Sequence, residues 1–342
     1  MSLRRVLVIQ TAYIGDVVLT TPLVRELSRL APKAEVHVVT TPLSAEIFRH
    51  CPYVTGTLTF DKANRKLPDL AGLIRHCRRT GYDLSLSVQT SVTSALLALL
   101  GGVPKRVGFD VQPFTTHSVP FRERGPEGRS RRILGLLEAV WPGVETSART
   151  ELFLSGRERA AASEALAGAA PGTRLVGMAP GSVRATKRWP AGHWSRLLKA
   201  LAGKGVTPVF VGGGAERDLC RRIIASSETE GAVNMAGRMS LLESAAVIAE
   251  TELMLSGDSA PMHMACAVGT PVFALFGPTV KEYGFFPTGE SDRVFEVDLE
   301  CRPCSLHGGR RCPRGHHRCM EEIDPAALAK AVTGFLNTRG GK

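Results

Sequence analysis

The stretch "RRVLVIQTAYIGDVVLTTPLVRELSRLAPKAEVHVVT" (residues 4–40) decides the fold class. It begins with the short apolar run RRVLVIQ (4–10), which predicts a buried strand. Apolar residues at helical spacing follow in DVVLTTPLVRELSRL (16–30), and AEVHVVT (34–40) predicts the next strand. A strand, a helix and a further strand in this order indicate a parallel sheet that is covered by helices on both faces.

The same alternation recurs along the rest of the chain. Further strands are expected at 55–60, 82–89, 105–109, 174–180, 207–213, 232–237, 252–258 and 271–277. The pattern is interrupted by the polar, Arg- and Gly-rich stretch 122–132 and by the linker-like EALAGAAPGT (164–173). We therefore predict two Rossmann-like α/β/α domains, at 1–165 and 172–324, with an amphipathic helix at 325–338. Two such domains that face each other would share a central cleft at the C-terminal ends of their strands, where ligands of open α/β sheets bind.

Composition and charge limit the class of protein. The 342 residues carry a net charge of +11, which favours acidic partners such as nucleic acid, an anionic membrane face or a phosphorylated substrate. The apolar run near the N-terminus is too short for a signal peptide, and ALLALLGGV (95–103) is too short to span a bilayer. We therefore expect a cytoplasmic protein with reduced thiols.

An acidic residue follows the first predicted strand. Gly15 and Asp16 open the first helix, where Asp16 either caps the helix or lies at the strand end as a base for a substrate hydroxyl. This turn has no G-x-G-x-x-G sequence. A dinucleotide fingerprint at the first strand, and with it a dehydrogenase, is therefore disfavoured.

Three strand ends of the second half carry residues suited to a nucleotide. The motifs are PGSVRATKRWP (180–190), with Ser182 and Lys187, GGGAERD (212–218), with Glu216, and GDSAPMHMA (257–265), with Asp258, Ser259 and His263. Backbone amides, hydroxyls and cations bind phosphate oxygens, whereas a carboxylate accepts hydrogen bonds from a ribose. Each motif alone also fits a structural role, as a basic loop, a helix cap or a core histidine. Together they indicate a nucleotide site.

These residues resemble a known family. IGDVVLTTPLVREL (14–27), PGSVRATKRWP and GDSAPMHMACAVGTPVFALFGPT (257–279) are similar to motifs of the ADP-heptose:lipopolysaccharide heptosyltransferases, glycosyltransferase family 9. The resemblance runs nearly end to end. The C-terminal CRPCSLHGGRRCPRGHHRCMEEI (301–323) resembles the Cys-rich segment of heptosyltransferase II members.

The resemblance implies a GT-B fold, with an N-terminal acceptor domain, a C-terminal donor domain and a last helix that crosses back to the first. It also implies an inverting single displacement that needs no metal or other cofactor. L-glycero-D-manno-heptose would pass from ADP-heptose to the first heptose of the lipopolysaccharide inner core. Heptosyltransferase I or a later-acting heptosyltransferase is the alternative within the family.

The family's functional residues transfer to this chain by motif. Asp16 would be the general base, and Ser182 and Lys187 would hold the diphosphate, with Lys187 also stabilising the leaving group. The other donor contacts implied are Glu216 to the ribose, Met239 to the adenine, and Asp258, Ser259 and His263 to the donor sugar and phosphates. Ala260 stands where the family often has Gly, which puts the contact expected there in doubt.

The acceptor implied is a phosphorylated Kdo–lipid A type glycolipid at the inner leaflet. An anionic acceptor would match the net charge of +11, and the candidate contacts are Lys62, Arg65, Lys66 and Arg106, together with Lys105 and the 122–132 stretch. The enzyme would then act as a peripheral protein on the cytoplasmic face of the inner membrane.

The four cysteines near the C-terminus leave an alternative open. Cys301, Cys304, Cys312 and Cys319 are compatible with a tetrathiolate zinc site, although the spacing is not the paired CxxC…CxxC of zinc ribbons. A zinc-containing nucleic-acid-binding protein is therefore the alternative from another class. The chain has no recognised nucleic-acid module or stacking motif, so we expect no nucleic-acid partner and no required metal.

Overall fold

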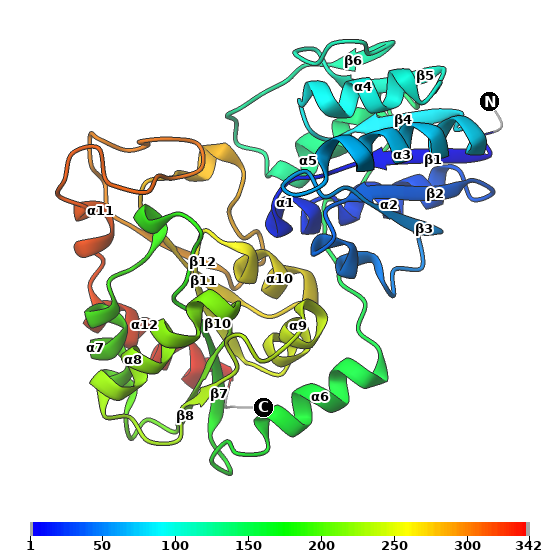
Figure 1. The fold of residues 1–342 in the computed structure, drawn as a ribbon. Helices are drawn as coiled ribbons and strands as arrows, with labels where there is room; N and C mark the ends of the chain where they lie inside the picture. Colours follow the sequence, from blue (N-terminus) through cyan, green and yellow to red (C-terminus); the bar gives the residue numbers. More distant parts are fainter. Residues whose placement is uncertain (1–2, 340–342) are drawn as a thin grey trace. The chain divides into compact units, whose positions relative to one another are not determined.

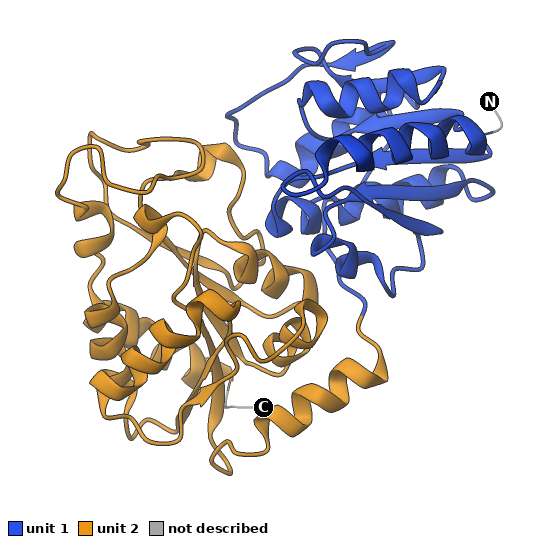
Figure 2. Ribbon diagram, in the orientation of Figure 1, with its two compact units in different colours: residues 1–153 blue, residues 154–342 orange. Residues whose placement is uncertain are grey.

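The chain divides into two compact units in the computed structural model, which describes residues 3–339. Unit 1 is Met1–Phe153 and unit 2 is Leu154–Lys342 (Figure 2). The boundary precedes the linker expected at 164–173, because residues 156–166 form helix α6 and pack against helix α9 of unit 2. Ser155 and Glu158 begin α6 with a reciprocal capping box, which fixes its start.

Unit 1 contains a six-stranded parallel sheet in the order β3-β2-β1-β4-β5-β6 (Figure 1). Its strands are β1 (Arg5–Ile9), β2 (Glu35–Thr40), β3 (Gly56–Thr59), β4 (Leu84–Ser87), β5 (Lys105–Phe109) and β6 (His117–Val119). Its helices are α1 (Ile14–Val18), α2 (Thr21–Leu30), α3 (Lys66–Thr80), α4 (Val92–Leu100) and α5 (Arg129–Leu134), with short 3-10 helices η1 (Ser44–Phe48) and η2 (Gly135–Leu137).

The core of unit 1 follows from the alternation of side chains along its strands. Leu7 and Ile9 of β1 pack in one apolar cluster with Leu73 of α3 and Leu97 of α4. The intervening Val6 and Val8 are also fully buried, and α2 and α5 contact each other in the second helical layer. A central strand that is buried on both faces reads as a continuous apolar run, as VLVI does.

Unit 2 has a second six-stranded parallel sheet, in the order β12-β11-β10-β7-β8-β9. Its strands are β7 (Arg174–Ala179), β8 (Val206–Phe210), β9 (Val233–Asn234), β10 (Leu253–Gly257), β11 (Val272–Phe276) and β12 (Arg293–Glu296). Its helices are α6 (Gly156–Leu166), α7 (Ala191–Leu201), α8 (Arg217–Ser227), α9 (Leu241–Ala249), α10 (Ala260–Val268), α11 (Arg318–Glu321) and α12 (Pro325–Arg339), with 3-10 helices η3 (Ala185–Lys187), η4 (Gly214–Glu216) and η5 (Lys281–Tyr283).

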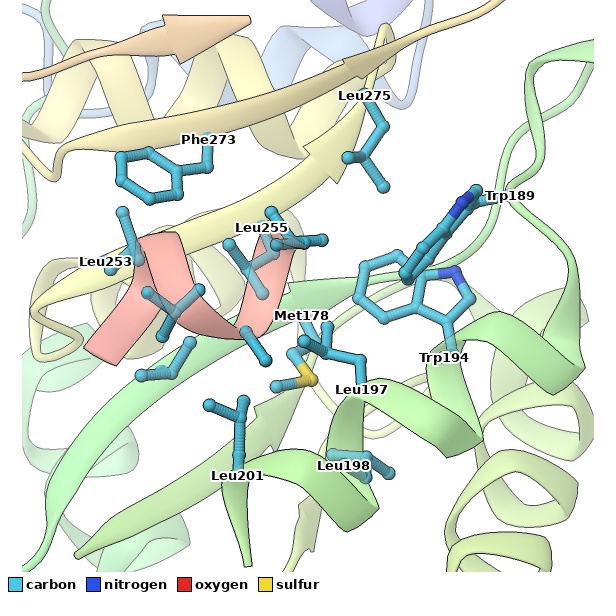
Figure 3. Close-up of a cluster of buried hydrophobic side chains, with 14 of the residues drawn as sticks. Met178, Trp189, Trp194, Leu197, Leu198, Leu201, Leu253, Leu255, Phe273 and Leu275 are labelled. Carbon is cyan, nitrogen blue, oxygen red and sulfur yellow. The ribbon is translucent and has the colours of Figure 1, made fainter. Parts of the chain in front are cut away.

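The last helix is part of the core of unit 2. Helix α12 packs against α7, and Val332 and Phe335 join the cluster that contains Trp194 and Leu255 (Figure 3). Its burial against these side chains explains the apolar face read from the sequence. The predicted crossing of this helix to the first domain stays a prediction.

Both sheets have the same strand order, which is 3-2-1-4-5-6 when each unit is numbered from its own first strand. The order reverses between β1 and β4 in unit 1 and between β7 and β10 in unit 2. In open α/β sheets, ligands bind beyond the carboxyl ends of the strands at such a reversal. The loops that follow these four strands are therefore the places to look for a site.

Candidate active site

In unit 1, a hydrogen-bond network holds the segment around Asp16. The Gln10 side chain donates to the Thr20 hydroxyl at 3.1 Å and accepts from the Ala12 amide at 3.2 Å, and the Thr20 hydroxyl donates to the Asp16 carbonyl at 2.8 Å. Asp16 lies half-buried in the first turn of α1. Its backbone is thus fixed at the end of β1, next to the strand reversal.

Arg129, at the start of α5, is the charged neighbour of Asp16. Burial lowers the pKa of the Arg129 guanidinium, and the negative charge of Asp16 acts in the opposite direction. The two groups lie close enough to interact although 113 positions separate them in the numbering of the chain. Arg129 belongs to the 122–132 stretch, but its proximity to Asp16 was not predicted from the sequence.

The Arg- and Gly-rich stretch 122–132 is folded around one buried side chain. The Arg132 guanidinium donates to the backbone carbonyls of residues 122, 123, 125 and 127. Arg132 is 8% exposed and its pKa is lowered by burial. This arginine therefore shapes the loop and is not available to a ligand.

The four candidate acceptor contacts have different surroundings. Lys62 is exposed, and its ammonium donates to the Thr11 carbonyl at 2.8 Å, in the loop that follows β1. Arg65 and Lys66 are exposed at the start of α3, where Arg65 pairs with Asp69 at 3.4 Å. Arg106 lies at the amino end of β5, whereas Asp16 follows the carboxyl end of β1, and Arg106 donates to the carbonyls of Val103 and Phe114. The structure thus brings Lys62, and not Arg106, to the strand reversal.

In unit 2, a buried ion pair spans the strand reversal. The Lys187 ammonium, after β7, lies 2.6 Å from Asp258 Oδ2, after β10. Their side chains are 11% and 6% exposed. The Thr279 hydroxyl, beyond β11, donates to the same carboxylate oxygen at 2.8 Å and is fully buried. The carboxylate of Asp258 therefore pairs with Lys187 and Thr279 and does not cap helix α10, whose N-cap residue is Ser259.

Ser182 lies on the loop that carries Lys187, and Glu216 lies on the neighbouring loop, which follows β8. The Ser182 hydroxyl accepts from the Arg184 amide at 3.3 Å, and the Arg188 guanidinium donates to the Ser182 carbonyl at 2.7 Å. Glu216 packs so closely on Gly181 that a Cβ there would lie 2.0 Å from Glu216 Cγ. Gly181 is therefore required by the approach of two loops and brings Glu216 next to Ser182.

Helix α10 carries Ser259 and His263. Ser259 is the N-cap residue, and its hydroxyl lies 3.1 Å from that of Ser256. His263 is 4% exposed, and burial lowers its pKa to about 4, with a further lowering from Lys187 and an opposing effect of Asp258. His263 is therefore a neutral imidazole at neutral pH, able to donate one hydrogen bond. Met239, half-buried, directly precedes Ser240, which caps α9.

The cysteine-rich segment forms a loop between β12 and α12. All eight cysteines of the chain are free thiols, and the Cys304 thiol donates to the Cys301 carbonyl. Within residues 3–339, no group of three or more His, Cys, Asp or Glu side chains is arranged to hold a metal ion. Zinc at the four cysteines stays an alternative that metal analysis of the purified protein would test.

Over the same residues, none of the helices combines the length and the apolarity that crossing a membrane requires.

A doubly wound parallel sheet with a buried ion pair, hydroxyls and glycine-rich loops at its strand reversal places the chain in the class of doubly wound α/β proteins. Residues 70–311 match the model of glycosyltransferase family 9 (heptosyltransferase). The chain belongs to this family.

A relative and two solved structures match nearly the whole length of the chain. The chain is 24% identical to lipopolysaccharide heptosyltransferase 2 of Escherichia coli K12, over 97% of this chain and 98% of that protein. A family 9 glycosyltransferase structure from Veillonella parvula has a TM-score of 0.86 at 22% identity, covering 99% of this chain and 98% of its own. The E. coli ADP-heptose lipopolysaccharide heptosyltransferase II structure has a TM-score of 0.80 at 21% identity, covering 98% and 100%.

These findings confirm several predictions. The fold class is confirmed as α/β of the GT-B type, with two Rossmann-like units. The prediction of a glycosyltransferase of the heptosyltransferase family is confirmed over the nucleic-acid-binding and dehydrogenase alternatives.

Proposed function

We propose that this enzyme transfers L-glycero-D-manno-heptose from ADP-heptose to the first heptose of the lipopolysaccharide inner core. The observation that carries the proposal is the buried Lys187–Asp258 pair at the strand reversal of unit 2, flanked by Ser182 and Glu216. The similarity to E. coli lipopolysaccharide heptosyltransferase 2 and to the structure of the E. coli ADP-heptose heptosyltransferase II favours this donor and this subtype.

Lys187 is the catalytic cation of the donor site. An ammonium has three N–H donors, and Asp258 uses one of them, which leaves two for oxygens of the diphosphate. The carboxylate of Asp258, itself held by Thr279, limits the rotation of the lysine side chain. A cation that is already oriented stabilises the charge that develops on the leaving ADP without reorganisation at the moment of reaction.

The remaining donor contacts follow from the same geometry. Ser182 is within the loop that carries Lys187 and supplies a hydroxyl to the phosphates. Glu216 accepts hydrogen bonds from the ribose hydroxyls, and Met239 packs near the adenine. Ser259 and the neutral imidazole of His263 donate to the sugar and phosphate oxygens.

Asp16 is the general base on the acceptor side. It removes the proton from the attacking heptose hydroxyl while that oxygen forms a bond to the anomeric carbon of the donor heptose. The bond between the anomeric carbon and the phosphate oxygen breaks, ADP leaves, and the configuration inverts. Arg129, whose guanidinium interacts electrostatically with Asp16, is the charged neighbour of this base.

The acceptor we propose is a phosphorylated Kdo–lipid A type molecule at the inner leaflet. Its phosphates suit the +11 charge of the chain, and Lys62, Arg65 and Lys66 are exposed on unit 1. Arg106 stays a candidate, with most of its donors used by backbone carbonyls. This acceptor implies a cytoplasmic, peripheral location on the inner membrane. No cofactor beyond the donor substrate is proposed.

The test compares wild type with Asp16→Asn, which keeps the shape of the side chain and removes the base. With ADP-heptose and a heptosylated Kdo–lipid A acceptor, we expect the variant to lose at least about 100-fold in kcat, since general bases contribute about 10²–10⁴. Binding of ADP should remain. Asp324→Asn, which changes the aspartate that bonds the first amides of α12, is the matched control. Undiminished transfer by Asp16→Asn would overturn the assignment of the base.

A further inference from the structure

The segment of residues 301–319, here called the cysteine loop, contacts the loop that carries Lys187. The Thr186 amide and hydroxyl both donate to the Gly309 carbonyl at 3.1 Å, and the Gly309 amide donates to the Thr186 hydroxyl at 2.7 Å. His317 Nε2 donates a hydrogen bond to the Thr186 carbonyl oxygen at 2.8 Å. Four hydrogen bonds thus join the cysteine loop to the residue next to Lys187.

The same contact also packs on the Lys187 side chain itself. Gly308 has a φ of +75°, and a Cβ added there would lie 3.0 Å from Lys187 Cγ and 3.2 Å from Cε. The backbone of the cysteine loop therefore lies against the aliphatic part of the lysine, where only glycine combines this conformation with this approach. A cavity of about 150 Å³ lies where the two loops meet, lined by Thr186, Gly309, Cys304, Cys312 and His317 among others.

The cysteine loop is itself held in shape on the side facing Thr186. Burial acts to raise the pKa of the Cys312 thiol, but backbone N–H groups of residues 314–317 more than offset this and lower it below the ordinary value. The backbone of residues 314–317 thus directs N–H groups towards the sulfur of Cys312. Aromatic rings form a second connection between the cysteine loop and the donor site. Phe285 lies between His263 of α10 and His307 of the cysteine loop, at ring-centroid distances of 6.4 Å and 6.3 Å.

We propose that Thr186 and His317 are positioning residues, through which the cysteine loop holds Lys187 in place for the diphosphate of the nucleotide donor. Neither residue touches the reacting atoms in this scheme. The identity of the ligand rests on the proposed function, whereas the bracing of the Lys187 loop does not. Cys304 and Cys312, which line the cavity between the two loops, then act on the donor site by shaping the loop that bears Gly308, Gly309 and His317.

The test uses the full-length protein and the variants Thr186→Val and Thr186→Ser. Valine removes the hydroxyl at nearly the same volume, and serine keeps it. We expect the Kd of ADP in calorimetry to rise about tenfold in Thr186→Val, equivalent to 1.4 kcal/mol, and to stay within about twofold in Thr186→Ser. In transfer assays KM for ADP-heptose should rise with Kd.

The matched control is Thr251→Val. Thr251 and Thr186 are both 5% exposed, but the Thr251 hydroxyl donates to the Ile248 carbonyl before β10, at the opposite end of that strand from Asp258. This variant should cost stability without changing the Kd of ADP. His317→Gln, which keeps a donor, should bind ADP better than His317→Leu.

A readout without ligand separates this inference from the proposed function. Hydrogen exchange of residues 183–188 should be faster in Thr186→Val and His317→Leu than in wild type or Thr251→Val. If wild type binds no ADP, the proposed donor is wrong, and the exchange rates alone decide whether the brace exists. Unchanged exchange overturns the inference in either case. An unchanged Kd in Thr186→Val, with wild type binding ADP, also overturns it.

Discussion

Replacing Lys187 by methionine leaves the carboxylate of Asp258 without its buried cation. Both side chains are about nine-tenths buried, and the ammonium and Oδ2 lie 2.6 Å apart. Removing one partner of a buried ion pair costs about 3–5 kcal/mol, because the remaining charge is neither solvated nor paired. The Thr279 hydroxyl still donates to Asp258, so we expect a value near the lower limit, about 3 kcal/mol.

Replacing both partners removes the uncompensated charge. In the double variant Lys187→Met, Asp258→Asn, the two side chains keep nearly their original volumes and carry no charge. We therefore expect it to be at least about 2 kcal/mol more stable than the sum of the two single variants indicates, which is within the range found for residues in direct contact.

Urea unfolding followed by tryptophan fluorescence measures these free energies. Trp189 and Trp194 lie in the core of unit 2 (Figure 3), whereas Trp141 belongs to unit 1. A Trp141→Phe background therefore leaves tryptophans only in the unit that contains the ion pair. This choice matters because a chain of two units need not unfold in one step.

The refuting results are specific. If the costs of Lys187→Met and Asp258→Asn add to within about 0.5 kcal/mol in the double variant, the two groups are not coupled. A single variant that loses less than about 1 kcal/mol would show that the pair is solvated, as exposed ion pairs are. Either result would show that Asp258 does not hold the Lys187 ammonium in a fixed orientation.

Two further predictions concern residues of unit 2, and a third concerns the metal dependence of the reaction. The pKa of His263 is lowered by burial from 6.5 to about 4, so the unfolded chain takes up a proton first as the pH falls. Stability should therefore decline between about pH 6.5 and pH 4, by about 3 kcal/mol in total at 1.36 kcal/mol per pKa unit, and an equally steep loss in His263→Asn would contradict this. Gly181→Ala should displace Glu216 and raise the Kd of ADP several-fold, whereas Gly192→Ala, where a Cβ meets nothing within 4 Å, should not; equal Kd values in calorimetry would refute the Glu216 contact. The rate of heptose transfer by the wild-type enzyme should be the same with EDTA as without it. A strict requirement for Mg²⁺ would show that the metal-independent scheme is wrong.

The central strands were predictable because they are buried on both faces. RRVLVIQ and PVFALFG are continuous apolar runs, and each contains a strand of the structure at nearly the expected bounds. The edge strands β6 and β12 were missed. Their residues are exposed or half-buried, so HSV and RVFE lack the apolar pattern by which strands are recognised.

The limits of unit 2 depend on tertiary packing. The Ala- and Gly-rich end of α6 resembles a linker in composition, and the helix belongs to unit 2 because it contacts α9. Neither periodicity nor propensity contains that information. The prediction of two α/β units is nevertheless confirmed, because it rests on the repeated alternation of strand and helix patterns and not on the position of the boundary.

In the candidate site, too, single residues could be predicted from local sequence, whereas their contacts could not. Lys187 and Asp258 were singled out separately because each follows a predicted strand, but their pairing depends on β7 and β10 being neighbours in the sheet. Thr279 and Thr186 were not singled out, since a hydroxyl has no distinctive spacing and their partners lie 21 and 123 positions away. Long-range contacts of this kind are decided by the fold and not by local sequence.

The most direct test of the proposed function is a transfer assay on a series of acceptors. Wild-type protein is incubated with ADP-heptose and Kdo–lipid A acceptors that carry no heptose, one heptose or two, and the products are measured by mass spectrometry. The account predicts the addition of one heptose to the acceptor with one heptose, and little to the other two. Transfer only to the acceptor without heptose would reassign the subtype to heptosyltransferase I, and no transfer to any of the three would contradict the proposed function.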